Sequence, residues 1–449
     1  MKMFTRSFYV VFPALLLWLS LPCRATAQIV TVEALTGSDE VGPHFQDVED
    51  AIKRFSQRDV EGARRLLESA RKKTPALAPP EILVAQLYLV TGQRPQVRAE
   101  LDKAIKKYPQ DPEPYLVLAD LAFAEGRITE AGLLYERASA VSRAYSDNPK
   151  RKRQMQIRGH AGAAAVLEAH DKWDEARDHI AAWVKLDPEK SNPHQRLAQA
   201  LFKLNQKKEA YAELKIAAKA DKKMPAPEVV MATFFSQAQE PGNAQKWIEL
   251  AQKEGKDAPT KAEIAKLLMQ SNKLKEAVDQ AEQAIRLDPT NLNARILAGM
   301  CQRMLGNLKQ AEEHFEAAHL LSPTNSQAIN QLALTLIERP DDASHKRAQE
   351  FAELSARVNP KSGDALAALG WVQYKMGRLS EATRTLMSST TLGNMSPESY
   401  FFVANILREE GRTADAAKVL DSVLSADQPF AYRKQANVLR EKLKKDLIR

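Results

Sequence analysis

The sequence predicts an all-α fold with an internal repeat. Residues with high helix propensity dominate the 449-residue chain, which holds 17 Gly and 6% aromatic residues. It shows no long alternation of β-branched and polar residues, which strands would require. Short strings also recur: Leu287–Asn291 (LDPTN) returns as Leu321–Asn325 (LSPTN), 34 residues later. A period of this length is typical of stacked repeats that share one continuous core.

The N-terminal residues 1–27 are predicted to be a signal peptide. Lys2 and Arg6 precede the uncharged apolar run Phe8–Leu21, and the small residues at 25–27 offer a cleavage site. The apolar run is shorter than the roughly 20 residues that a membrane helix needs. We therefore expect an exported protein, periplasmic or extracellular, with no membrane span after cleavage. The alternative is a protein anchored in the membrane by an uncleaved N-terminal segment.

The next segment, residues 28–43, is predicted to be a linker because it contains Gly37, Ser38 and Gly42-Pro43. Removal of the signal peptide takes away three cationic residues and no acidic ones, which lowers the formal net charge from +8 to +5. Such a mild excess of positive charge does not indicate a nucleic-acid partner. Cys301 is then the only cysteine, so an internal disulfide is excluded.

Eleven repeat units can be placed between residue 44 and about residue 430. They begin at residues 44, 78, 112, 157, 191, 225, 258, 292, 326, 363 and 397. A small residue recurs at position 20 of nearly every unit: Ala63, Val97, Ala131, Ala176, Ala210, Ala244, Ala277, Ala311, Ala348, Ala382 and Ala416. This pattern resembles the tetratricopeptide repeat, a helix–turn–helix unit of 34 residues. The resemblance implies a right-handed α-solenoid of about eleven units with a C-terminal capping helix.

The spacing has a physical reason. Two antiparallel helices approach closely only where both carry small side chains, at positions 8, 20 and 27, while bulky residues fill the space beside the crossing. Pro at position 32 of several units ends the second helix, as Pro289 and Pro323 do. A large side chain at such a crossing, for example in Ala311→Phe, would overpack it.

The repeats are predicted to form two sub-arrays. The first, 44–156, holds three units and a basic insertion, and the second, 157–429, holds eight units. Eleven extra residues follow the third unit, within Ser142–Arg158, and predict either a longer second helix or a loop. The run Lys150–Arg153 is interpreted as a solvated face, with a patch for phosphate or an acidic partner as the alternative.

Two further features modify the array. Three extra residues within Glu338–Ala348 lengthen the internal turn of the ninth unit. Beyond the last unit, residues 430–449 are predicted to form a capping helix, with a membrane-surface helix as the alternative. Its apolar face is Tyr432, Ala436, Leu439 and Leu443.

Motifs for chemistry are weak. His314 and His319 form an H-x-E-x-x-H string, but five residues place them about 140° apart around a helix, so they cannot share a metal ion. The histidines at 44, 160, 170, 179, 194 and 345 show no ligand spacing. Cys301 is predicted to be a buried, inert thiol. Nucleophile-elbow and phosphate-loop motifs are missing, so we expect no catalysis, no metal and no cofactor.

The resemblance also implies a binding surface. In this family the first helix of each unit lines a concave face, with positions 2, 5, 9, 12 and 13 pointing into it. The predicted groove residues are Phe123, Phe202, Met300, Arg303, Trp371, Tyr374, Phe401 and Asn405. Exposed aromatic residues there suit an extended peptide or a partner helix, unless several of them pack against the neighbouring unit. The Lys and Asn pattern with which co-chaperone members hold a C-terminal carboxylate is missing.

We therefore expect an exported, non-catalytic scaffold for protein–protein interaction, with protein partners and no nucleic acid. The alternative is a structural subunit of an envelope complex for polysaccharide export, protein export or outer-membrane assembly. A third hypothesis, an enzyme with an unrecognised site, has no motif in its favour.

Overall fold

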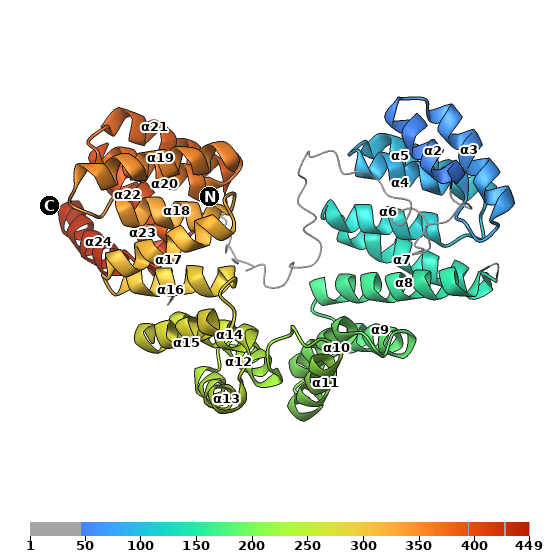
Figure 1. The fold of residues 1–449 in the computed structure, drawn as a ribbon, viewed down its shortest axis with the longest axis horizontal. Coiled ribbons are helices and arrows are strands. Elements are labelled where there is room, and N and C mark those ends of the chain that lie inside the picture. The colour runs from blue at the N-terminus through green and yellow to red at the C-terminus, as the bar shows by residue number, and fades with distance from the viewer. Residues whose placement is uncertain (1–45, 147, 394, 426–427, 449) are drawn as a thin grey trace, which may run out of the picture. The chain divides into compact units, whose positions relative to one another are not determined.

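The computed structural model describes residues 46–146, 148–393, 395–425 and 428–448 (Figure 1). The predicted signal peptide (1–27) and linker (28–43) lie outside this range. Every regular element within it is a helix, which confirms the predicted all-α class. Among the helices of this range, none combines the length and apolar character needed to cross a membrane.

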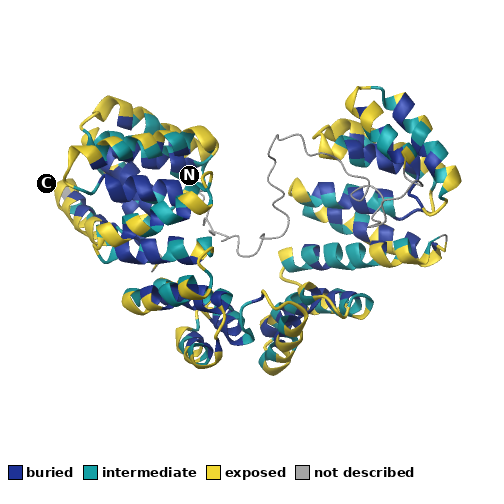
Figure 2. Ribbon diagram, viewed as in Figure 1, coloured by how far each residue is buried: buried dark blue, intermediate teal, exposed yellow. Residues whose placement is uncertain are grey.

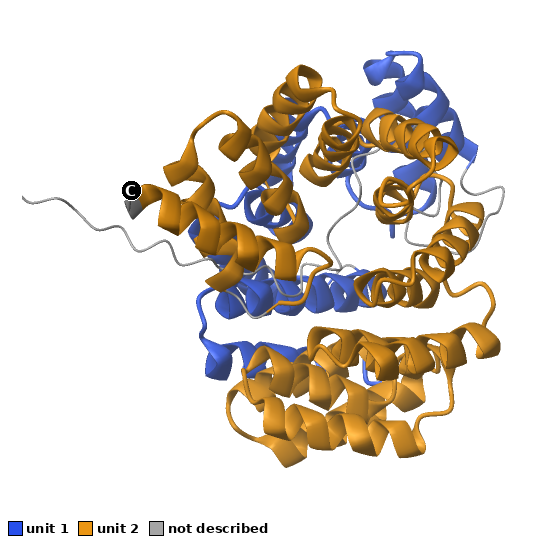
Figure 3. Ribbon diagram, turned by 90° about the vertical axis from the view of Figure 1, so that its left-hand side faces the viewer, with its two compact units in different colours: residues 1–188 blue, residues 189–449 orange. Residues whose placement is uncertain are grey.

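The chain divides into two compact units, Met1–Pro188 and Glu189–Arg449 (Figure 3). The helices of the first unit are α2 (Gln46–Ser56), α3 (Val60–Lys73), α4 (Pro80–Val90), α5 (Arg94–Lys107), α6 (Glu113–Ala124), α7 (Ile128–Ala144), α8 (Pro149–Ala169) and α9 (Trp173–Leu186). Those of the second unit are α10 (Ser191–Lys203), α11 (Lys207–Ala220), α12 (Pro227–Gln237), α13 (Pro241–Glu254), α14 (Ala258–Gln270), α15 (Leu274–Leu287), α16 (Leu292–Met304), α17 (Leu308–Leu321), α18 (Ser326–Leu336), α19 (Asp342–Val358), α20 (Gly363–Lys375), α21 (Leu379–Leu392), α22 (Pro397–Glu409), α23 (Thr413–Ser425) and α24 (Arg433–Ile448).

Successive helices pair, from α2 with α3 to α22 with α23, as a helix–turn–helix repeat requires. The small residues predicted at position 20 are buried in all eleven pairs, and the buried residues cluster where the paired helices face each other (Figure 2). The approach at Gly299 is especially close, because a Cβ atom built there would lie 2.6 Å from Cε1 of Phe315. Small residues at the crossings are therefore what allows each pair to pack.

The turn inside most pairs needs a left-handed residue. Gly306, with φ of +84°, connects α16 to α17, and its amide donates to the Arg303 carbonyl oxygen. Asn205 and Asn272 adopt the same conformation in other units, with φ of 62° and 58°. Gly and Asn are the residues that adopt this conformation at least cost, which explains their recurrence in these turns.

The insertion after the third unit is divided between two helices. Helix α7 ends at Ala144, and α8 begins at Pro149, where the Asn148 side chain accepts a hydrogen bond from the Arg151 amide at 3.1 Å. The extra residues thus lengthen the first helix of the fourth pair as well as the second helix of the third. The predicted sub-array boundary at 156/157 falls inside α8, whereas the two compact units meet after Pro188.

The basic run at the start of α8 is partly structural. The Arg151 side chain is 12% exposed, with Nη2 at 2.8 Å from Oδ2 of Asp111, and it also pairs with Glu113. Arg153 Nε donates to the Leu186 carbonyl oxygen at 2.8 Å. Two members of the run therefore hold α8 to its neighbours, while Lys150 is exposed.

The C-terminal helix α24 caps the last pair. Ala436, Leu439 and Leu443 are buried on the face that meets α23, as the apolar spacing predicted. Tyr432 is buried too, but it lies just before the helix, and its hydroxyl contacts Trp371 of α20.

Candidate functional site

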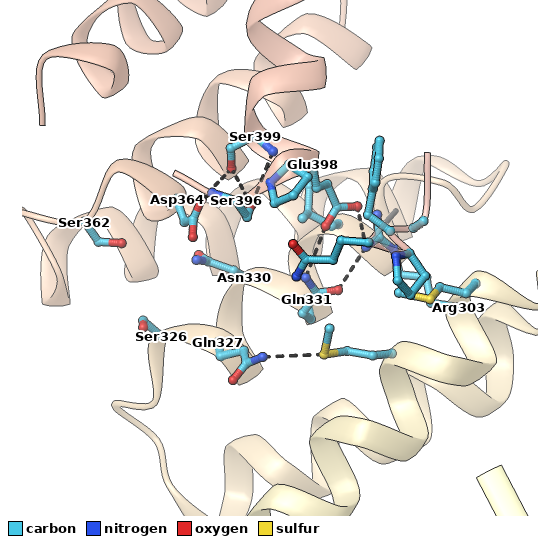
Figure 4. Close-up of a pocket in the computed structure, with 18 residues that line it drawn as sticks. Arg303, Ser326, Gln327, Asn330, Gln331, Ser362, Asp364, Ser396, Glu398 and Ser399 are labelled. Atoms are coloured by element: carbon cyan, nitrogen blue, oxygen red, sulfur yellow. Dashed lines mark hydrogen bonds and ion pairs between the residues drawn. The ribbon is translucent and has the colours of Figure 1, made fainter. Parts of the chain in front are cut away.

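The candidate site lies on the second unit, where the first helices of four successive pairs meet. Helices α16, α18, α20 and α22 surround a cavity of about 360 Å³ (Figure 4). Its lining mixes amide, hydroxyl, charged and apolar groups, including Met300, Asn330, Gln331, Asp364 and Glu398. Such a mixture suits a ligand with both polar and apolar groups.

One wall of this cavity is a segment of the chain itself, Gln428–Ala431, which connects the last repeat to α24. This segment is not helical, and its Phe430 is buried. Tyr432 follows and is 6% exposed. The C-terminal segment Gln428–Tyr432 therefore lies against the first helices of the last repeats and buries two aromatic side chains there.

The Tyr432 ring occupies an aromatic box. It stacks on Phe401 with a centroid separation of 5.2 Å, meets Phe402 edge-on at 5.5 Å, and meets Trp371 edge-on at 5.7 Å. Its hydroxyl donates to Glu338 and accepts a 3.2 Å hydrogen bond from Trp371 Nε1. Burial raises the pKa of Tyr432, although Arg303 opposes the shift, so the hydroxyl stays protonated and can donate.

A buried ion pair lies beside the box. Arg303 Nη1 is 2.8 Å from Oε1 of Glu398, and the side chains are 4% and 9% exposed. Gln331 bridges the pair: its Oε1 accepts from Arg303 at 2.9 Å and its Nε2 donates to Glu398 at 3.2 Å. Burial acts to lower the pKa of Arg303, but the interactions with Glu398 and Tyr432 together outweigh it and the net shift is upward. The Arg303 Cζ atom also lies 5.3 Å from the centroid of the Tyr432 ring, in cation–π range.

Helix N-termini supply the polar rim of the cavity. Ser396 caps α22, and its amide donates to Oδ1 of Asp364 at 2.7 Å. Ser399 Oγ donates to the same carboxylate oxygen, also at 2.7 Å. These bonds join α20 to α22 and fix the rim.

The structure brings together five of the eight predicted groove residues. Met300 and Arg303 line the cavity, Trp371 and Phe401 belong to the aromatic box, and Tyr374 stacks on Trp371 at 5.2 Å. All five lie near the C-terminal segment. Trp371 and Phe401, expected to be exposed, are instead 4% and 5% exposed.

The other three belong neither to the cavity lining nor to the aromatic box. Phe123 is half-buried in the first unit, and Phe202 packs against Phe234 and Phe235 at 5.2 and 4.9 Å. Asn405 donates to the Phe401 carbonyl oxygen of its own helix at 2.8 Å. Packing within the array, the alternative to an open groove, therefore applies to several predicted positions.

The sequence alone did not assign Glu398, Asn330, Glu338 or Tyr432 to this site. The first three occupy positions 2, 5 and 13 of their units, which the resemblance to the tetratricopeptide repeat places on the concave face. Tyr432 lies beyond the last repeat, where the register has no position for it. Its spacing from Ala436 matches the apolar face of the capping helix, so the sequence predicted a contact within the cap and not a contact with the repeats.

Among the described residues, no group of three or more His, Cys, Asp or Glu side chains is arranged to hold a metal ion. His160 and His179, which show no ligand spacing in the sequence, nevertheless meet with their Nδ1 atoms 3.2 Å apart. Cys301 is fully buried, and burial raises the pKa of its thiol to about 12, as an inert cysteine requires.

Comparisons with known proteins support the repeat. A sequence model of the tetratricopeptide repeat matches residues 54–121 and 268–334. A tetratricopeptide-repeat-containing protein of Pseudomonas aeruginosa is 25% identical over 122 residues, which are 27% of this chain. The match covers only 20% of that relative's length.

Several solved structures share low similarity with the chain. Yeast Tom70 is 13% identical with a TM-score of 0.40, and Cut9 in the APC/C hetero-tetramer Cut9–Hcn1 is 12% identical with a TM-score of 0.41. In both comparisons 90% of this chain and 96% of the other are covered. YrrB, described as having an unusual peptide-binding site, is 19% identical with a TM-score of 0.32, over 42% of this chain and 96% of its own.

Each compact unit contains one of the two matched segments. The helix pairs in these segments cross at small, buried residues. The chain is therefore all-helical over its described residues and carries two segments similar to the tetratricopeptide repeat.

Proposed function

We propose that the protein is a non-catalytic interaction scaffold that binds an extended peptide or a helical segment of a partner on the inner face of α16, α18, α20 and α22. Tetratricopeptide-repeat proteins are generally scaffolds of this kind. One observation carries the assignment to this site: a non-helical segment of the chain, Gln428–Tyr432, already lies on that face and is bound through aromatic and polar side chains.

The chemistry of the face supports a peptide ligand. The aromatic box accepts a ring that carries a hydroxyl group, and the amides of Asn330 and Gln331 offer donors and acceptors that match a peptide backbone. Anchoring by a few buried aromatic side chains, with polar groups around them, is the usual energetic pattern of a protein interface.

A selection of displayed peptides against the full chain tests this function. We expect selected peptides to bind one site, and Gln331→Ala to weaken binding about tenfold or more, because it removes a polar group of the cavity. Gln310→Ala, an exposed position on α17, is the matched control and leaves binding unchanged. Failure to select any peptide, or binding that ignores Gln331, would contradict the assignment.

We further propose that the protein is exported, on the basis of the features of residues 1–27. N-terminal sequencing of the protein from its native host tests this. A mature chain that begins at Gln28 supports cleavage, and a chain that begins at Met1 and stays with membranes supports an uncleaved anchor.

The alternative role, a structural subunit of an envelope complex, predicts a different result on purification. A subunit copurifies with envelope components in a fixed stoichiometry, whereas an adaptor exchanges among soluble partners. Crosslinking in the native host followed by mass spectrometry separates the two.

A further inference from the structure

The face that the C-terminal segment Gln428–Tyr432 covers keeps buried polar groups for which the segment supplies no hydrogen-bond partner. Arg303 uses Nη1 for Glu398 and Gln331, but its Nε and Nη2 atoms are buried with no hydrogen-bond acceptor in the described part of the chain. These two groups form the side-on fork of the guanidinium, which can hold one carbonyl or carboxylate oxygen pair. Oδ1 of Asn330, on the opposite wall, is likewise buried and has no donor among the described residues.

These unmet groups have an energetic meaning. A buried polar group without a partner costs about 1–3 kcal/mol, and more when it is charged. Tyr432 interacts with Arg303 through its ring, 5.3 Å from Cζ, and electrostatically through its hydroxyl, but it does not fill both donor groups of this fork. The cavity of about 360 Å³ next to Phe430 also remains unfilled by the segment. An occupant that kept the tyrosine contacts, filled the cavity and supplied oxygen acceptors would therefore bind this face better than the segment does.

We propose that Gln428–Tyr432 is an internal competitor for the partner of this face, and that the partner is an extended segment presenting a tyrosine side chain to the box of Trp371, Phe401 and Phe402. The inference rests on the proposed function and specifies its ligand. The tyrosine is required because two groups bind its hydroxyl: Trp371 Nε1 donates to it and Glu338 accepts from it. Phenylalanine in the same place would remove the acceptor of Trp371 Nε1 and the hydroxyl donor of Glu338, which would keep only its ion pair with Lys375.

Competition within one chain is strong. A tethered segment acts at an effective concentration on the order of millimolar, so a partner of ordinary affinity gains access only when the segment is weakened. The segment therefore sets the threshold for binding. Loss of its two hydroxyl hydrogen bonds, by Tyr432→Phe, should lower that threshold while the ring and the docked helix α24 stay in place.

The experiment uses the full chain and a fluorescein-labelled peptide, Gln-Pro-Phe-Ala-Tyr-Arg, which copies residues 428–433. We expect Tyr432→Phe to bind this probe about tenfold or more tightly than the unmodified chain, because the segment loses at least one hydrogen bond of about 1.4 kcal/mol. Tyr400→Phe, at a half-buried tyrosine of α22, is the matched control and leaves probe binding unchanged. A second probe with Phe in place of its Tyr should bind the Tyr432→Phe chain at least tenfold more weakly than the first.

The outcomes separate two failures. Equal binding of the first probe by both chains, or equal binding of the two probes by the variant, overturns the internal competitor; peptides from the display selection would still bind through Gln331. If neither probes nor displayed peptides bind any chain, the proposed function fails as well. Phe430→Leu, which weakens the segment through a different residue, gives the same readout should Tyr432→Phe fail to fold.

Discussion

Trp371 and Tyr432 are 61 residues apart in the sequence, yet Nε1 of Trp371 lies 3.2 Å from the hydroxyl oxygen of Tyr432. The same hydroxyl reaches Glu338 of the ninth repeat. A residue beyond the last repeat is therefore bound to side chains of the ninth and tenth, and stacks on the eleventh through Phe401. This arrangement couples the C-terminal cap to the inner face of the array.

The buried ion pair beside this contact should be needed for stability. Arg303→Met removes the cation and leaves Glu398 buried without its partner, which should cost about 3–5 kcal/mol in the free energy of unfolding. The double variant Arg303→Met with Glu398→Gln removes both charges and should recover part of that loss. Urea unfolding measures each value. A double variant as unstable as the sum of the single ones would show that the two side chains do not interact.

The close helix crossing of the eighth repeat should not tolerate even one methyl group. In Gly299→Ala the new Cβ would lie 2.6 Å from the Phe315 ring, which is itself fully buried, so we expect a loss of about 1–3 kcal/mol. Phe315→Leu makes room, so Gly299→Ala should cost less in that background. Gly242→Ala, where nothing lies within 4 Å of the added Cβ, serves as the control and should not destabilise. Thermal or urea unfolding of the unmodified chain and the four variants decides.

The helix pairs could be predicted because each repeats one local pattern. Ala311 and Phe315 recur in kind along the chain at positions 20 and 24, and their burial follows from the geometry of two crossing helices. The residues of the concave face, such as Arg303 and Glu398, could be predicted from the same register. The segment that lies on this face could not be predicted, because the contact of Tyr432 with Trp371 occurs once and is not part of the repeat.

A similar limit applies to the histidines and to the basic run. His160 and His179 lie in different helices of one pair, and their spacing of 19 residues matches no helical or motif pattern. Arg151 belongs to a run of four cations that looks like a solvated face, yet its carboxylate partners lie 38 and 40 residues earlier. Such contacts depend on which helices become neighbours, and only the fold determines that.

Arg151 and Lys150 should behave differently although they are adjacent. Arg151→Met leaves Asp111 and Glu113 near each other without the cation between them, and should destabilise the chain by about 3 kcal/mol. Lys150→Met changes an exposed side chain and should have an effect within about 0.5 kcal/mol. Unfolding in urea compares the two. Equal effects would indicate that the run acts as a solvated face after all.

The pair of His160 and His179 should make stability depend on pH. Burial lowers the pKa of both imidazoles in the folded chain below the ordinary value of 6.5, and for His160 the neighbouring His179 adds to the shift. For His179 the carboxylates of Asp178, Glu175 and Glu136 oppose the shift, but burial prevails. The unfolded chain therefore binds more protons than the folded chain just below pH 6.5, and the free energy of unfolding should fall as the pH falls through that window.

A double variant isolates this contribution. Between about pH 7.5 and pH 5.5, the unmodified chain should lose more stability than His160→Asn with His179→Asn, because asparagine does not titrate there. His314, whose pKa burial also lowers, contributes equally to both chains and cancels in the comparison. His170→Asn, at an exposed histidine after α8, is the control and should keep the pH dependence of the unmodified chain. If the double variant loses as much stability as the unmodified chain over this range, the two imidazoles titrate at ordinary values and their contact does not persist in solution.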